Sequence, residues 1–405
     1  MGLLADIRLP RVARPLQASA PTLLTLIVAI AFSGCQSLRV GTSGGQMEGD
    51  WLTEGGGPDR AQAAGESIRP PLELVWEFKT NGGFGPVAPL LLRDAVLVPT
   101  RKGEVHGIDL VTGKSLGVIG FGESIDGSPV VDTDGMMYVP ISWGRRGLQA
   151  FDLTTGSTRW RDKRVPVHAG LLLAPERLIA ADVESRVAAY DPRTGEVLWD
   201  RVLSDRAAVH GAPVWAGEEA IVVATDEGVL HALSLSDGSS LWQRSVRAPV
   251  YVTPAAFDGV VYVATTRGLL IAVDLKSGSE RFAFDAGNGE VRLSPPAVTR
   301  DALVFGGSDG VLRAVDPASG TPLWTFAGGE PIAGAPLIAG DVVYFGDMGK
   351  ILRALSLDDG HLLWEMELEG RIKSAMAAGS GRVVVLAEPR SVYLFRTSEA
   401  YAARD

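Results

Sequence analysis

The stretch Val187–Trp199 reads VAAYDPRTGEVLW, and its pattern Ala-x-Asp-x-x-x-Gly-x-x-x-Trp recurs through most of the chain. Exact copies begin at Ala150, Ala189 and Ala314, and drifted copies with the same spacing begin at Gly107, Ala232, Ala272 and Ala354. The motif glycines are 39 to 43 residues apart. A fixed period in this range is typical of propellers and repeat arrays.

Each position of the motif has a physical role. The apolar run before the aspartate predicts a strand, the aspartate can accept hydrogen bonds from backbone amides two residues on, and the glycine can adopt the positive φ of a tight turn. The motif therefore predicts strand, turn and strand. The tryptophan on the second strand would bury roughly 150 to 250 Å² against the next unit. One unit cannot cover its own apolar face, whereas a closed ring of units can.

Short apolar segments that open on small residues or proline recur eight times, starting near residues 86, 128, 169, 211, 253, 294, 334 and 374. The two ends of the array complement each other. Residues 72–78 (LELVWEF) form a tryptophan strand with nothing before it, and residues 391–397 (SVYLFRT) lack one after it. We therefore predict an all-β fold, an eight-bladed β-propeller of four-stranded antiparallel blades over residues 72–397, in which strand 72–78 completes the last blade. Such closure removes free sheet edges.

Composition limits the class of protein. The chain has 405 residues, of which 46% are hydrophobic and 49 are glycine, and its formal net charge is −10. This is enough apolar material for a large core, and the glycines suit many short turns. We expect no nucleic-acid partner, because no basic stripe emerges from the acidic background. Residues 398–405 follow the last predicted strand, and we expect them to form a C-terminal tail.

The N-terminus carries an export signal. Arginines at positions 8, 11 and 14 precede an apolar run over residues 23–32, and the sequence Phe-Ser-Gly-Cys follows at 32–35. This order of basic region, short apolar region and small residues is typical of a signal peptide. The run is too short to span a membrane comfortably as a helix. We therefore expect residues 1–34 to be removed.

The end of this signal resembles the bacterial lipobox. Ser33 and Gly34 are the expected small residues, whereas Phe32 departs from the usual leucine. The resemblance implies that Cys35, the only cysteine of the chain, becomes the lipidated (palmitate-bearing) N-terminal residue. Gln36 in place of aspartate implies passage to the outer membrane. The alternative is an ordinary cleaved signal with Cys35 as a free thiol.

Residues 36–71 leave two alternatives open. Their Gly, Ser, Pro, Gln and charged residues predict a flexible tether between the lipidated Cys35 and the propeller. Trp51 and the run Gly55–Pro58 interrupt that composition. They resemble the short lead-in found ahead of many quinoprotein-like propellers, which implies a segment docked on the disk.

The repeated motif is the tryptophan-docking motif of the pyrroloquinoline quinone (PQQ) repeat family, and the resemblance covers residues 72–397. That family contains PQQ-dependent dehydrogenases and the lipid-anchored BamB propellers of outer-membrane protein assembly. The lipobox, the short propeller and the lack of a CxxCH motif resemble the second branch. The resemblance implies a non-catalytic scaffold, anchored by its lipid alone at the periplasmic face of the outer membrane. Its expected partner is an outer-membrane β-barrel assembly protein or another envelope protein.

Dehydrogenases of the family place an adjacent cysteine pair against the quinone and hold Ca²⁺ with carboxylates and amides. This chain has one cysteine, and its asparagines are limited to Asn81 and Asn288. We therefore expect no enzyme activity, no cofactor and no metal. A degenerate PQQ-dependent dehydrogenase remains as an alternative to the scaffold, ranked third, after the ligand-binding alternative given below. The tryptophans that we assign to blade wedges are Trp76, Trp160, Trp199, Trp242, Trp324 and Trp364.

One mouth of the ring is the candidate binding face. The residues that enter successive inner strands include Asp126, His168, His210, Tyr251, Arg292 and Lys373. The loops after the second strands of the blades share this face in other propellers, and they add Trp143, Arg145 and Arg146. We hypothesise that this mouth binds a partner segment or a small anionic ligand, since small residues would suffice structurally.

Two other interpretations of this face remain. The loops can be merely solvated, with the histidines satisfied by neighbouring carbonyls. A metal site at His168 and His210 lacks ligands, because two are too few. The second functional alternative is a sensor or carrier that binds a small ligand or peptide in the central funnel.

Overall fold

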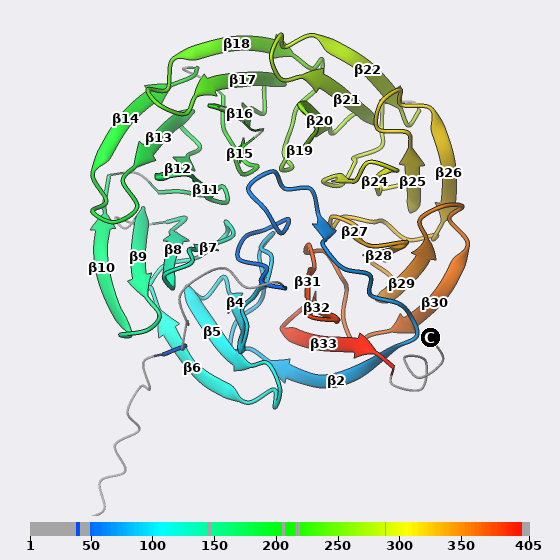
Figure 1. Ribbon diagram of the computed structural model, residues 1–405, viewed down its shortest axis with the longest axis horizontal. Coiled ribbons are helices and arrows are strands. Elements are labelled where there is room, and N and C mark those ends of the chain that lie inside the picture. The colour runs from blue at the N-terminus through cyan, green and yellow to red at the C-terminus, as the bar shows by residue number, and fades with distance from the viewer. Residues whose placement is uncertain are drawn as a thin grey trace, which may run out of the picture. The chain divides into compact units, whose positions relative to one another are not determined.

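The computed structural model describes residues 38–40, 49–143, 147–164, 166–204, 207–215, 217, 219–287 and 289–398. In these residues every regular element is a strand, and eight antiparallel four-stranded blades surround a common centre (Figure 1). The predicted eight-bladed propeller is confirmed. No helix in this part of the chain is long and apolar enough to cross a membrane. The expectations for residues 1–34, Cys35 and the tail beyond Ser398 lie outside the described residues.

The first four blades follow one another along the chain. Blade 1 contains β3 (Leu90–Leu91), β4 (Ala95–Pro99), β5 (Glu104–Asp109) and β6 (Ser115–Gly120). Blade 2 contains β7 (Val130–Val131), β8 (Met136–Pro140), β9 (Leu148–Asp152) and β10 (Ser157–Asp162). Blade 3 contains β11 (Leu172–Ala174), β12 (Arg177–Ala181), β13 (Arg186–Tyr190) and β14 (Val197–Val202). Blade 4 contains β15 (Val214–Trp215), β16 (Ala220–Ala224), β17 (Val229–Ser234) and β18 (Ser240–Ser245).

The remaining blades complete the ring. Blade 5 contains β19 (Ala255–Phe257), β20 (Val260–Ala264), β21 (Leu269–Asp274) and β22 (Glu280–Asp285). Blade 6 contains β23 (Ala297–Val298), β24 (Leu303–Phe305), β25 (Val311–Val315) and β26 (Pro322–Ala327). Blade 7 contains β27 (Leu337–Ala339), β28 (Val342–Gly346), β29 (Ile351–Ser356) and β30 (Leu362–Glu367). Blade 8 contains β31 (Ala377–Gly379), β32 (Arg382–Ala387), β33 (Ser391–Thr397) and β2 (Leu72–Lys79).

The ring closes as the sequence predicts. Strand β2 pairs antiparallel with β33, with Leu72 opposite Thr397 and Lys79 opposite Ser391. Figure 1 shows the blue β2 beside the red β33. The first strand of the array therefore completes the last blade, and no blade is left with a missing strand.

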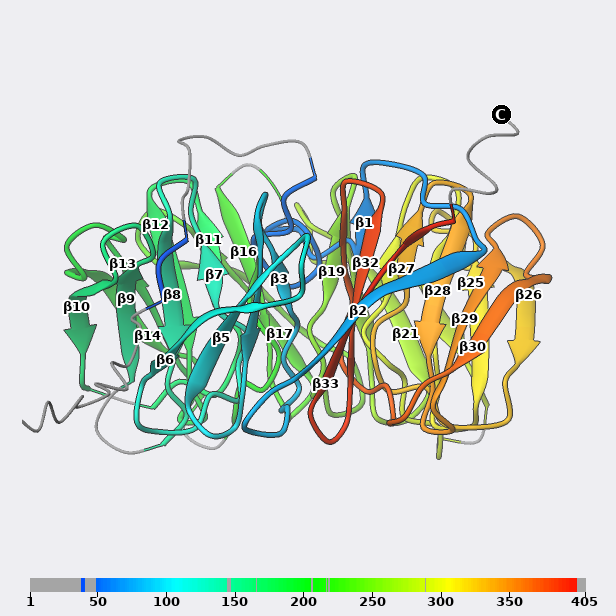
Figure 2. The same cartoon turned by 90° about the horizontal axis from the view of Figure 1, so that it is seen from below.

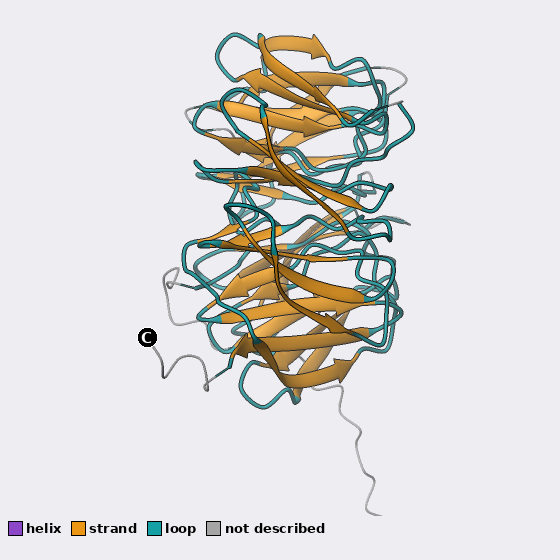
Figure 3. Cartoon of the chain, turned by 90° about the vertical axis from the view of Figure 1, so that its right-hand side faces the viewer, coloured by secondary structure: helices purple, strands orange, loops and turns teal. Residues whose placement is uncertain are grey.

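Burial differs between the strands of a blade. Second strands such as β16 and β20 are buried throughout, whereas fourth strands such as β10 alternate between exposed and half-buried residues. Figure 3 shows these strands side-on, with loops gathered at the two ends of the blades. The alternation follows from position, because a fourth strand lies at the rim and only one of its faces meets the next blade.

The tryptophans join neighbouring blades. Each indole Nε1 donates to the carbonyl that follows the aspartate position of the next blade: Trp160 to Pro192 (2.8 Å), Trp199 to Leu235 (2.9 Å), Trp242 to Leu275 (2.6 Å), Trp324 to Leu357 (2.7 Å) and Trp76 to Leu110 (2.9 Å). The indole also lies on the motif glycine of that blade. These five tryptophans are blade wedges, as predicted. The sixth predicted wedge, Trp364, packs edge-on against Phe395 of blade 8 at a ring-centroid distance of 6.4 Å.

Blade 5 makes the same junction with different groups. Phe282 takes the tryptophan position and has no N–H to donate. The Tyr262 hydroxyl donates to the carbonyl of Pro317 instead, at 2.9 Å. Burial raises the pKa of Tyr262 to about 12, so the phenol keeps its proton at neutral pH. At these six junctions the carbonyl after the aspartate position is therefore hydrogen-bonded, by an indole or by a phenol.

Residues 50–66 lie in the centre of the ring, where the blue ribbon crosses it in Figure 1. Trp51 is buried and exchanges two backbone hydrogen bonds with Leu91 of blade 1. Short strand β1 (Ala63–Ala64) pairs parallel with β27. The carbonyls of the segment accept from inner strands of further blades: Leu52 from Val131, Pro58 from Trp215, Asp59 from Ala256, Ala61 from Val298 and Gln62 from Ile338. Of the two alternatives for residues 36–71, the docked one holds for this stretch.

Candidate functional site

The centre of the ring holds a buried cation. Arg60 is 2% exposed, and its Nη1 donates to Thr53 Oγ1 (2.7 Å) and to the carbonyl of Glu54 (2.6 Å). Its Nη2 donates to the carbonyl of Leu171, just before β11. Burial lowers the pKa of Arg60, while the Glu54 and Asp59 carboxylates act in the opposite direction. The guanidinium thus ties the docked segment to blade 3.

A cavity of about 410 Å³ is lined by Glu54 of the docked segment. Its wall is formed by the starts of the inner strands, where the sequence placed the candidate face. Asp126, His168, His210, Tyr251 and Lys373 all line it. The structure therefore brings together five of the nine predicted site residues around one funnel.

Two aromatic pairs stand on this funnel. Trp143 packs against His168 with a ring-centroid distance of 5.0 Å and an interplanar angle of 86°. Tyr251 packs against His210 at 4.7 Å and 37°. Trp143 is 59% exposed and Tyr251 is 49% exposed. Each histidine therefore backs a large aromatic ring that solvent, or a partner, can reach.

The charged groups of the rim are largely paired with one another. Arg101 Nε lies 3.3 Å from Asp126 Oδ1, Lys373 Nζ lies 2.7 Å from Glu388 Oε2, and His210 Nε2 lies 3.4 Å from Asp226 Oδ2. A charged ligand that enters the funnel would therefore have to break one of these pairs before it could form an ion pair of its own. One interpretation of the sequence is that neighbouring carbonyls satisfy the histidines. His210 differs from that interpretation, because its partner is the carboxylate of Asp226.

His168 is different from its neighbour. Its Nδ1 is buried and has no hydrogen-bond partner in the described part of the chain. Burial lowers the pKa of His168, with the Asp126 and Asp182 carboxylates opposing that effect. The imidazole is therefore neutral at neutral pH, and its Nδ1 is closed off from solvent.

Other predicted residues lie apart from the cavity or beyond the described chain. Arg292 is exposed, its backbone amide donates to Ser308 Oγ at 2.9 Å, and it does not line the funnel. Trp143 stands beside the funnel through its contact with His168. Arg145 and Arg146 lie outside the described residues. Glu54, which does line the cavity, was missed because it belongs to the lead-in and not to the repeat.

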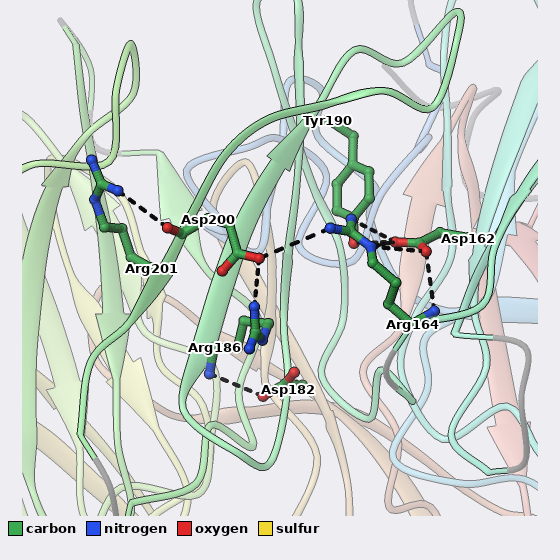
Figure 4. A network of polar contacts seen from close by, with 7 residues as sticks. All are labelled: Asp162, Arg164, Asp182, Arg186, Tyr190, Asp200 and Arg201. Carbon is green, nitrogen blue, oxygen red and sulfur yellow. Dashed lines mark hydrogen bonds and ion pairs between the residues drawn. The ribbon is translucent and has the colours of Figure 1, made fainter.

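A second polar cluster lies between blades 2 and 3 (Figure 4). Arg164 pairs with Asp162 at 2.8 Å, and the Tyr190 hydroxyl donates to the same carboxylate at 2.8 Å. Arg186 pairs with Asp200 at 2.5 Å. The adjoining cavity is about 160 Å³. Because its charges neutralise one another across the two blades, the cluster is a structural lock.

The described residues contain no group of three or more His, Cys, Asp or Glu side chains arranged to hold a metal ion.

Comparison with known proteins gives a consistent family. The family model described as outer membrane protein assembly factor BamB matches residues 72–207, 183–327 and 308–402. The assembly factor BamB of Yersinia pestis is 30% identical over 158 residues, which are 36% of this chain and 40% of that protein. BamB of Burkholderia pseudomallei is 27% identical over 265 residues, 62% of this chain and 68% of that protein. The Yersinia match thus spans less than half of that relative.

Solved structures agree on the fold. BamB from Moraxella catarrhalis has a TM-score of 0.68 at 18% identity, covering 80% of this chain and 99% of its own. Quinohemoprotein alcohol dehydrogenase from Comamonas testosteroni has a TM-score of 0.72 at 15% identity, covering 86% and 82%. At these identities both likenesses show the propeller alone.

Proposed function

Because the chain belongs to the family of the outer membrane protein assembly factor BamB, we propose that it is a non-catalytic scaffold that assists β-barrel assembly in the outer membrane. Cys35 carries the lipid that holds it there, and the propeller works at the periplasmic face. Its partner is an outer-membrane β-barrel assembly protein or another envelope protein, bound to the propeller through protein contacts. The membrane is reached through the lipid anchor.

The pair of exposed aromatic rings at the funnel mouth supports this proposal most directly. Trp143 and Tyr251 are each backed by a histidine, at 5.0 Å and 4.7 Å. Tryptophan and tyrosine dominate the hot spots of protein interfaces. A ring already held by a neighbour loses little conformational entropy when a partner covers it. The mouth therefore offers a preorganised anchor for a partner segment.

The funnel itself supports a second candidate, a sensor or carrier. Its volume of about 410 Å³ lies within the range of roughly 300 to 1,000 Å³ that is usual for ligand pockets. The side chains of His168 and Glu54, which both line it, would orient a small ligand. A degenerate dehydrogenase is the third candidate, and its support is the fold alone.

The test is complementation in a strain that lacks the protein. Loss of the protein is expected to lower the amount of folded barrel proteins in the outer membrane, and the unaltered chain is expected to restore it. The double variant Trp143→Ala, Tyr251→Ala is expected to restore it poorly while melting at the same temperature. Leu323→Ala, an exposed residue on the outer strand of blade 6, is the control. Full rescue by the double variant would remove this mouth as the partner site.

A further inference from the structure

The junction between blades 1 and 2 lacks its tryptophan. Gly117 stands at the tryptophan position of blade 1, and Gly107 stands at the alanine position. The carbonyl that an indole would bond in blade 2 is that of Leu153. It accepts a hydrogen bond from the backbone amide of Val40, at 3.0 Å. Val40, which precedes the repeat, thus supplies the missing donor.

Leu38 supplies the missing volume. Its side chain is fully buried, and a Cβ added at Gly107 would lie 2.1 Å from Leu38 Cδ1. Leu38 and Val40 belong to the apolar cluster that also contains Phe151 and Leu153 of blade 2. The segment 38–40 therefore does the two tasks of the absent indole. It fills the space between the blades and it bonds the turn.

We propose that this segment holds the edge formed by blades 1 and 2 against the membrane surface, an inference that rests on the proposed lipid on Cys35. Two residues lie between Cys35 and Leu38. An extended chain spans at most about 3.6 Å per residue, so these three steps keep the Cα of the lipidated residue within roughly 11 Å of the Cα of Leu38. The linker between the lipid and the propeller is therefore only residues 36–37, and not the whole of residues 36–71. The disk cannot turn freely on it.

The charge of this edge fits an anionic lipid surface. Residues 157–164, on and after β10, contain four basic residues, Arg159, Arg161, Lys163 and Arg164, against Asp162. Arg164 pairs with Asp162 and Arg159 pairs with Asp152, so this edge keeps a net positive charge through Arg161 and Lys163. Residues 362–369, on and after β30 of blade 7, contain three glutamates and no basic residue. The whole chain has a net charge of −10, so the basic edge beside the anchor stands out. Basic residues at a membrane surface are attracted by anionic headgroups.

The experiment measures which edge lies near lipid headgroups. The lipidated protein is reconstituted on vesicles of phosphatidylethanolamine and phosphatidylglycerol that contain a headgroup nitroxide lipid. A fluorophore is placed on Gly120→Cys in blade 1 or on Ala327→Cys in blade 6, since lipidated Cys35 leaves no other thiol. The two exposed positions are equivalent, because Gly120 pairs with Glu104 and Ala327 with Val311 at the start of the third strand. A Cβ at Gly120 meets nothing within 4 Å.

We expect strong quenching at Gly120→Cys and weak quenching at Ala327→Cys. A long Gly-Ser insert after Ser37 should abolish the difference, whereas the same insert after Val40 should preserve it. Equal quenching with the native linker would overturn the inference, and so would a difference that survives the insert after Ser37. Flotation of the vesicles separates the two proposals: protein that does not float has no lipid anchor, which refutes the proposed anchoring and this inference together.

Discussion

A motif glycine in this propeller meets two demands. Gly195 has φ of 74°, which favours glycine, and a Cβ there would lie 2.5 Å from Trp160 of the preceding blade. Gly259 has φ of 72° but a Cβ there would meet nothing within 4 Å. Comparing Gly195 with Gly259 therefore distinguishes the cost of the left-handed backbone, which both share, from the cost of the close indole, which only Gly195 has.

Gly195→Ala should therefore destabilise the protein more than Gly259→Ala does. The left-handed backbone costs about 1 to 2 kcal/mol in both variants, and displacing the indole adds about 1 to 3 kcal/mol in the first. Urea unfolding of both variants measures the difference in the free energy of unfolding. If both variants lose the same free energy of unfolding, the indole moves aside at no cost, and Gly195 is required only for the conformation of the turn.

At this scale the sequence predicts residues that sit in the repeat. His168, His210 and Tyr251 fall at one position of successive blades, so alignment of the repeat alone places them on one wall. Glu54 lies in an unrepeated stretch, and no periodicity can place it. Arg292 occupies the aligned position, yet its backbone is held by Ser308 and its side chain is exposed. Alignment fixes a position in the chain, not the direction of a side chain.

Among the elements, the docked segment 50–66 differs most from a tether. Its hydrogen bonds to the inner strands run between backbone groups, which any sequence could form. Composition could therefore not decide between docking and a free chain. Two side chains make the segment specific: Trp51 is buried beside blade 1, and Arg60 joins the segment to Leu171.

Arg60→Ala should release this segment. The substitution removes the donors to the carbonyls of Glu54 and Leu171 and leaves both without their partner. Leaving a buried acceptor without its donor costs about 1 to 3 kcal/mol. Arg69→Ala, which removes an exposed pair with Asp341, should cost about 1 kcal/mol or less.

Denaturant unfolding and limited proteolysis of residues 50–66 measure both effects. If Arg60→Ala unfolds at the same urea concentration as Arg69→Ala, the buried guanidinium does not hold the segment.

For the whole molecule, ring closure is the feature that the sequence predicts best. The lone strand Leu72–Lys79 and the last strand Ser391–Thr397 can satisfy each other only by pairing, and they do. The repeat does not predict how the junction of blades 1 and 2 is filled, because Leu38 comes from outside the repeat. The partner is likewise beyond a single chain, since an interface is a property of two surfaces.

The most direct test of the assembly role is mass spectrometry of the proteins that copurify with the mildly crosslinked, lipid-anchored chain. Cys35→Ser, which cannot be lipidated, is the matched control. We predict enrichment of an outer-membrane β-barrel protein with periplasmic repeats over that control. If no such barrel is enriched over the control, the assembly role is contradicted, and binding of a small ligand in the funnel becomes the better-supported function.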